Sequence, residues 1–240
     1  MAQDASRKRS FKSKMFGTEM HESIFGVQEW NLDIRQFAVY LTGEAMDYHA
    51  DDNWDKREEP GVEYQMSARL IKNLHILSDI DPKRPILIHM KTNGGDWNEG
   101  MAIYDTIRFS PNPIVILNYT HARSMSSIIF QSADRRVMMP HSNFMLHEGT
   151  MTISGTWKTV VSGVNFAKKD NPVMLEIYTN RMKEKGRYSK LTKANIKKLL
   201  QDIMNKKEDV YLTAQQTVDW GLADSIFDGD WQKLRQRLRK

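Results

Sequence analysis

Residues 85–95 read PILIHMKTNGG, a short apolar run that ends in two glycines. Ile- and Leu-rich runs of this length, bounded by proline and glycine, are typical of a strand buried in a parallel sheet. The paired Gly94 and Gly95 allow a tight turn and leave backbone N–H groups free to face a ligand or a developing oxyanion. Taken alone, the same pair also fits an ordinary strand-to-helix turn.

Helix and strand patterns alternate on both sides of this run. Apolar residues at three- and four-residue steps predict helices over residues 64–77 and 97–108. Further strands are expected at residues 37–41, 114–117, 137–139 and 143–147, and a short helix at 124–130. Repetition of strand, turn and helix in units of about thirty residues predicts an α/β domain with parallel strand pairing.

The second half of the chain is richer in helix. A long helical region is expected over residues 157–204, broken at residues 170–172 and near Gly186. After a short strand at residues 210–212, Thr213 and Gln216 have capping-box spacing, and Gly221 is expected to end that helix.

The charge is unevenly distributed along the 240 residues. The formal net charge is +5, yet residues 1–14 carry +4 and residues 233–240 carry +5, so the remainder carries −4. This favours solubilising or docking tails over a nucleic-acid-binding surface. We therefore predict a mobile basic N-terminal arm (residues 1–30), one domain (31–228) with an acidic surface insertion at about 47–63, and a basic C-terminal tail (229–240).

Composition excludes several classes of chemistry. With no cysteine, the chain has no disulfide, no cysteine nucleophile and no thiolate metal site. It also has no apolar run long enough to span a bilayer, no apolar core of a secretory signal and no Gly-rich lysine loop for ATP. A cytoplasmic protein without cofactor, metal, membrane or nucleic-acid partner is expected.

Three polar residues lie where predicted elements meet. Ser124 follows a strand and opens a helix, where unpaired backbone donors stabilise negative charge, although serine is also a common N-cap. His147 ends the strand at residues 143–147, and Asp209 precedes the strand at 210–212. A nucleophile, a base and an acid that orients the base are the parts of a hydrolase, with the Gly-Gly turn as amide donor.

The same segments resemble the proteolytic subunit of Clp proteases. The similar blocks are ILIHMKTNGG (86–95), GMAIYDTI (100–107), ARSM (122–125), FMLH (144–147), EDVYLTA (208–214) and WGLADSI (220–226). By this resemblance Ser124, His147 and Asp209 take the positions of the catalytic triad. The N–H groups of Gly95 and Met125 take those of the oxyanion hole.

The resemblance also implies an architecture and partners. It implies a ClpP/crotonase-type repeated ββα superhelix with a helical handle, here extended over about residues 150–206. It further implies a homo-oligomer, a heptamer-like ring or stacked rings, that cleaves polypeptides in an internal chamber and is supplied by an AAA+ unfoldase.

The chain departs from the family pattern around the triad. Arg123 replaces a small residue before the nucleophile, where it could reshape the substrate groove or favour acidic side chains. Glu208 replaces a basic residue linked to ring-to-ring contacts. Ser126 and Ser127 occupy positions of small residues and are interpreted as packing residues.

Three alternatives remain open. One is a crotonase-type acyl-CoA enzyme, which needs no such triad. Another is a relative of signal-peptide peptidases or phage prohead proteases, in which Lys91 or Lys168 would act as base. The third is a scaffold that keeps the fold and the oligomer but has lost turnover.

Overall fold

The computed structural model describes residues 18–42 and 61–236, and its centre is an eight-stranded sheet. The strand order is β1-β2-β3-β4-β5-β8, with β6 beside the end of β4 and β7 beside β6. The strands are β1 (Leu32–Asp33), β2 (Ala38–Thr42), β3 (Ile86–Thr92), β4 (Ile114–Arg123), β5 (Arg135–Met138), β6 (Asn143–Leu146), β7 (Val210–Thr213) and β8 (Ser225–Ile226). Only the β1–β2 and β6–β7 pairs of this sheet are antiparallel.

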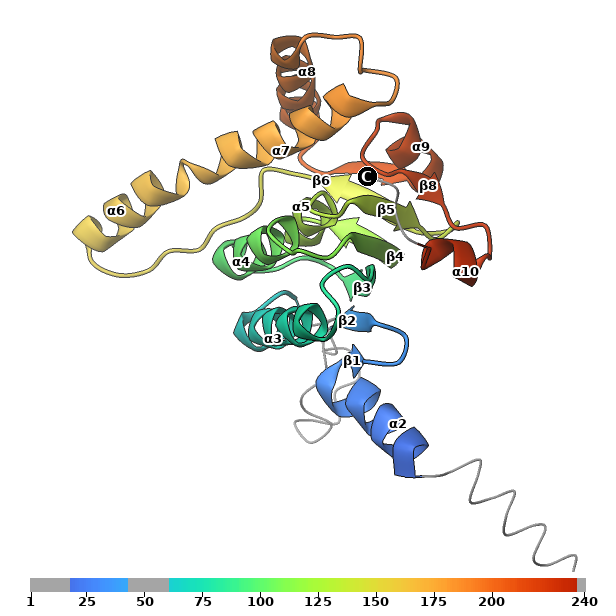
Figure 1. Ribbon diagram of the computed structural model, residues 1–240. Coiled ribbons are helices and arrows are strands. Elements are labelled where there is room, and N and C mark those ends of the chain that lie inside the picture. Colours follow the sequence, from blue (N-terminus) through green and yellow to red (C-terminus); the bar gives the residue numbers. More distant parts are fainter. Residues whose placement is uncertain (1–17, 43–60, 237–240) are drawn as a thin grey trace, which may run out of the picture.

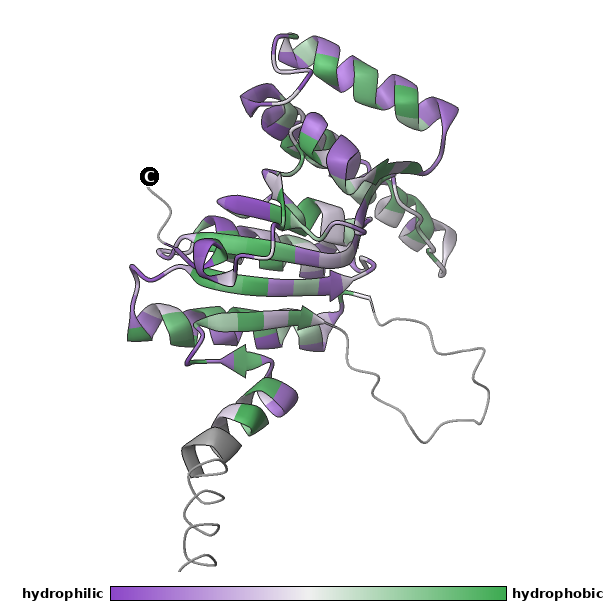
Figure 2. Ribbon diagram, turned by 90° about the vertical axis from the view of Figure 1, so that its right-hand side faces the viewer, coloured by the Kyte–Doolittle hydropathy of each residue, from purple (hydrophilic) through white to green (hydrophobic). Residues whose placement is uncertain are grey.

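The strand β3 is buried along almost its whole length, as the apolar run predicts. It lies between β2 and β4 and is parallel to both. Figure 2 shows that the central strands are mostly apolar. The mixed α/β class with a mostly parallel sheet is therefore confirmed, and it is consistent with the fold that the resemblance implies.

Three helices pack on one face of the sheet: α3 (Tyr64–Ile80), α4 (Trp97–Arg108) and α5 (Met125–Phe130) (Figure 1). The helix α4 starts at its N-cap Asp96, whose carboxylate accepts a hydrogen bond from the Glu99 amide. Because α4 follows β3 and α5 follows β4 within a few residues, these strand ends and helix starts gather at one edge of the sheet.

A helical arm extends from this body. Its members are α6 (Trp157–Ala167), α7 (Asp170–Glu184) and α8 (Lys193–Lys206), so the predicted long helical region is confirmed. Its first break lies at residues 168–169 and not at 170–172, because proline is tolerated in the first turn of a helix and residues 170–172 open α7. Lys168 and Lys169 keep right-handed helical backbone angles, which places α6 and α7 almost in line (Figure 1). No residue of α6 is buried, whereas α7 buries one face against α5 and α8.

Two terminal helices were not predicted from the sequence. The N-terminal one, α2 (Thr18–Trp30), occupies part of the expected arm. The C-terminal one, α10 (Trp231–Leu234), inserts the buried Leu234 against Leu87, Val115 and Leu117 on the other face of the sheet. Residues 1–17, most of the acidic insertion and residues 237–240 lie outside the described residues.

The capping box is confirmed: Thr213 and Gln216 form it reciprocally at the start of α9 (Ala214–Asp219). None of the described helices is long and apolar enough to cross a bilayer.

A buried ion pair ties the C-terminal segment to the sheet. The Arg136 side chain, 2% exposed, forms a two-pronged contact with Asp224 and also donates to Gln131 Oε1 and the Gly221 carbonyl. Burial, and secondarily Arg181, lower the pKa of Arg136 to about 9, so the guanidinium stays charged at neutral pH. Lys185 also contacts Asp224.

We expect Asp224→Asn to lower the free energy of unfolding by about 3 kcal/mol, because it leaves a buried guanidinium without its counter-charge. The measurement is urea unfolding at one fixed protein concentration. Asp228→Asn, which breaks the exposed ion pair with Lys233, is the matched control and should leave the midpoint unchanged. Equal effects of the two substitutions would contradict this role of Asp224.

Candidate active site

The sequence-predicted site residues meet at the edge of the sheet where β3, β4 and β6 end. Gly94 and Gly95 follow β3, Ser124 follows β4, and His147 follows β6. Asp209 directly precedes β7, which runs antiparallel to β6 and therefore brings its start to the same edge. The structure thus brings together all five residues.

The two glycines let the turn after β3 approach the end of β4. Gly94 has φ 109°, and a Cβ built on it would lie 2.7 Å from both the Ser124 Cβ and the Arg123 carbonyl oxygen. Gly95 pairs with Val62, and a Cβ there would lie 2.3 Å from Val62 backbone atoms. No other residue type fits either position without displacing backbone.

Ser124 lies at a strained strand-to-helix turn. Its backbone angles, φ 50° and ψ −129°, lie in a region that side chains other than glycine rarely adopt. Such a turn projects the hydroxyl away from the backbone, as in the nucleophile turns of α/β hydrolases.

Two buried serines support this turn. Ser126 Oγ donates to the Arg123 carbonyl (2.7 Å) and accepts from the Arg123 amide (2.8 Å). Ser127 Oγ donates to the Ser124 carbonyl at 2.6 Å and lies 2.6 Å from the Tyr178 hydroxyl of α7. Burial raises the pKa of Tyr178, so its hydroxyl stays neutral. Both serines are buried, in agreement with the packing interpretation, and their hydroxyls also brace the turn.

His147 connects Ser124 to Asp209. Its Nε2 lies 2.8 Å from Ser124 Oγ, and its Nδ1 lies 3.3 Å from Asp209 Oδ1. The His147 side chain is 16% exposed and that of Asp209 is 42% exposed, so the histidine is largely shielded while the carboxylate stays in contact with water. This order of contacts would let His147 accept the Ser124 proton and Asp209 stabilise the resulting imidazolium.

Two backbone amides near Ser124 remain available for a ligand. Within the described part of the chain, the N–H groups of Gly95 and Met125 donate to no acceptor. Met125 opens α5 directly after Ser124, and Gly95 follows the glycine that contacts Ser124. Amides in such positions can stabilise an oxyanion.

The sequence patterns do not indicate the residues that surround Ser124, His147 and Asp209. Tyr211 donates to Asp209 Oδ2 at 3.3 Å, Asn143 accepts from Arg123 Nε at 3.2 Å, and Tyr178 reaches the turn from α7. The period-two pattern of β7 could have indicated that Tyr211 and Asp209 share a face. Tyr178 lies 51 positions from Ser127, and no local pattern signals that contact.

The contacts of Ser124 and Lys168 bear on the alternative in which a lysine acts as base. Among the described residues, Ser124 Oγ contacts a histidine and no lysine, and Lys168 Nζ bonds to Asn165 on α6. This geometry disfavours a lysine base. The described residues hold no cluster of three or more His, Asp or Glu side chains that could bind a metal.

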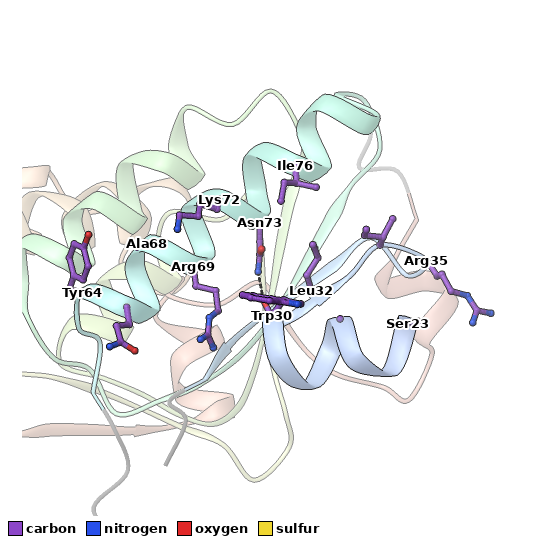
Figure 3. A pocket seen from close by; sticks show the side chains of 13 residues that line it. Ser23, Trp30, Leu32, Arg35, Tyr64, Ala68, Arg69, Lys72, Asn73 and Ile76 are labelled. Atoms are coloured by element: carbon purple, nitrogen blue, oxygen red, sulfur yellow. Dashed lines mark hydrogen bonds between the residues drawn. The ribbon is translucent and has the colours of Figure 1, made fainter. Parts of the chain in front are cut away.

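A large cavity, about 910 Å³, lies away from these residues, between α2 and α3 (Figure 3). Trp30, Leu32 and Ile76 give it apolar walls, and Asn73 donates a hydrogen bond to the Trp30 carbonyl beside it. The residues that line this cavity include no set of contacts comparable to Ser124, His147 and Asp209, so the candidate active site is the one at Ser124.

Comparison with known proteins agrees with the resemblance. Residues 59–230 match the family described as Clp protease. The ATP-dependent Clp protease proteolytic subunit of Deinococcus radiodurans is 26% identical over 169 residues, which cover 70% of this chain and 76% of that protein. The ATP-dependent Clp protease proteolytic subunit 2 of Treponema denticola is 27% identical over 167 residues, which cover 69% of this chain and 77% of that protein. The ATP-dependent Clp protease proteolytic subunit 3 of Rhodococcus jostii is 32% identical over 124 residues, which cover 51% of this chain and 53% of that protein.

We expect Gly94→Ala to slow the reaction of Ser124 with a fluorophosphonate by about 100-fold, since the new methyl group displaces the turn by a few tenths of an ångström or more. The rate of adduct formation is measured by intact mass. Gly229→Ala is the control, because Gly229 also has a positive φ (92°) but open space around a Cβ. An unchanged reaction rate in Gly94→Ala would show that the contact with Ser124 has no effect on the site.

Proposed function

This chain belongs to the Clp protease family, and on that basis we propose that it is a serine endopeptidase with Ser124 as nucleophile, His147 as base and Asp209 as orienting acid. The observation that carries the proposal is the continuous set of contacts from Ser124 Oγ through the imidazole to the Asp209 carboxylate. The strained turn and the two available amides support it.

The proposed reaction follows from these contacts. Ser124 Oγ attacks the carbonyl carbon of a peptide bond while His147 Nε2 takes the hydroxyl proton. The carbonyl oxygen becomes an oxyanion, which the N–H groups of Gly95 and Met125 stabilise. The imidazolium then gives its proton to the leaving amine. A water molecule, deprotonated by His147 in turn, hydrolyses the acyl-enzyme and regenerates Ser124.

The substrates are unfolded polypeptides or peptides. The relatives are named as proteolytic subunits of ATP-dependent proteases, and this chain contains no ATP-binding loop of the Walker type. We assign ATP use to a partner chain, an AAA+ unfoldase that delivers the substrate.

Assembly into a ring or into stacked rings is part of the proposal. The helix α6 extends from the body with no buried residue, and it exposes Trp157 (80%) and Phe166 (60%). Exposed apolar surface on a projecting helix favours burial against another subunit. A second copy of the chain would provide that burial, and closed rings are common among homo-oligomers.

We expect a fluorophosphonate probe to label the wild type at one residue and to leave Ser124→Ala unlabelled. Asp209→Asn should label slowly, and it should lower peptide turnover on the order of 10⁴-fold because the imidazole loses its orienting charge. Intact mass and peptide mapping locate the adduct, and a fluorogenic peptide gives turnover. Ser132→Ala, which removes a buried hydroxyl from the turn just after α5, is the control and should label normally.

Failure of the assembled wild type to label would favour the scaffold alternative. Turnover unaffected by Asp209→Asn would refute the assignment of the acid, while labelling lost in Ser124→Ala would still support the nucleophile.

We expect Val161→Lys in α6 to lower the mass of the assembly in solution, because a charge replaces part of the apolar face of the helix. Light scattering measures the mass. Phe109→Lys is the control: Phe109 is 85% exposed at the end of α4, far from α6 along the chain, and should leave the mass unchanged. An assembly that Val161→Lys does not affect would exclude α6 from the subunit interface.

A further inference from the structure

The side chain of Arg123 lies on the same face of the sheet as those of His147 and Asp209. Arg123 pairs with Met145 across β4 and β6, and Met145 pairs with Tyr211 across β6 and β7. Paired residues of neighbouring strands point to the same face, and so do residues two positions apart in one strand. His147 is two positions beyond Met145, and Asp209 is two positions before Tyr211.

Two contacts hold the Arg123 guanidinium in this row. Nε donates to Asn143 Oδ1 at 3.2 Å, and Cζ lies 5.4 Å from the centre of the Tyr211 ring. The hydroxyl of the same Tyr211 donates to Asp209 at 3.3 Å. The cation is therefore fixed beside the acid end of the triad, one residue before the nucleophile, instead of extending freely into solvent.

The charge of Arg123 has no partner within the described part of the chain. Its contacts are the Asn143 amide, the Tyr211 ring and the Ser126 hydroxyl at its own backbone, and none is a carboxylate. The two terminal nitrogens form no hydrogen bond to described residues. A guanidinium held in this way presents two parallel N–H donors, the geometry that binds a carboxylate.

We propose that Arg123 forms a cationic subsite that selects substrates carrying a glutamate or aspartate next to the cleaved bond. This inference rests on the proposed peptidase function, because it specifies the substrates of the same site. Asn143 and the Tyr211 ring orient the guanidinium, and the substrate carboxylate supplies the missing counter-charge.

Arg123 also has a route to the Asp209 carboxylate, through the ring and hydroxyl of Tyr211. Through Tyr211, the cation could act on the Asp209 carboxylate and affect the reaction of every substrate equally. A subsite instead changes the ratio of rates between an acidic substrate and its neutral isostere, which is the quantity that decides between the two roles.

The test uses internally quenched peptides that differ by Glu or Gln at one position beside the cleaved bond, each position being varied in turn. We expect the wild type to prefer Glu over Gln by about tenfold in kcat/KM at one position at least. Arg123→Gln should bring that ratio close to one, and Arg123→Lys should retain part of it. Tyr211→Phe keeps the ring and should lower turnover of both peptides alike.

Two measurements remain informative if Arg123→Gln does not fold. The Glu preference of the wild type should weaken between about 0.05 and about 1 M salt, since an exposed ion pair is screened. In Ser124→Ala, which cannot react, fluorescence anisotropy should give tighter binding of the Glu peptide than of the Gln peptide.

Equal kcat/KM for Glu and Gln peptides at every position would overturn the proposal, as would a Glu preference that survives Arg123→Gln. Equal losses for both peptides in Arg123→Gln would also overturn it, in favour of the role through Tyr211. The absence of fluorophosphonate labelling in the wild type would instead refute the peptidase function itself.

Discussion

The close approach of Gly94 to Ser124 is the contact on which the rest of the site depends. It joins the ends of β3 and β4 so closely that a single methyl group has no space between them. Parallel pairing fixes the register of these strands from Ile86 and Ile114 onward, and a shift between Met90 and Thr92 adjusts it just before the glycines. The apolar core therefore determines where the serine and the free amides lie relative to one another. The geometry of the site therefore follows from strand register together with the turns at Gly94 and Ser124.

The strained backbone conformation of Ser124 is stabilised by contacts with α7, which lies outside the turn itself. Ser127 connects the Ser124 carbonyl to Tyr178 in α7, and Arg181, one turn further along α7, donates to the Gln131 and Ala133 carbonyls beyond the end of α5. The short helix α5 is thus held at both ends by the same arm helix. An isolated six-residue helix is unstable in water, so these contacts supply the order that its own sequence cannot.

Sequence patterns predicted the elements whose signals are local. The strand β3, the helices α3 and α4, and the capping box at Thr213 follow from apolar spacing, turn residues and caps within a few positions. The same patterns predicted that Ser124, His147 and Asp209 lie at element ends, and the structure brings them together. The strand β4 was predicted too short, because its polar second half, up to Arg123, is stabilised by pairing with β6 and not by burial alone. The Arg136–Asp224 pair and the covering of the second sheet face by α10 join residues far apart in the sequence, where single-sequence patterns carry no signal.

The helical arm carries both an exposed apolar surface, on α6, and the contacts that support the turn at Ser124, on α7. The helix α6 exposes apolar side chains and buries none, while α7, almost in line with it, holds α5 and through it the turn at Ser124. Burial of α6 against another subunit would restrict α7 as well, since only two residues with helical backbone angles separate the helices. The free energy gained in that contact would then also stabilise the strained turn. In the assembly proposed above, contact through α6 would therefore be coupled to the geometry of Ser124 through α6 and α7.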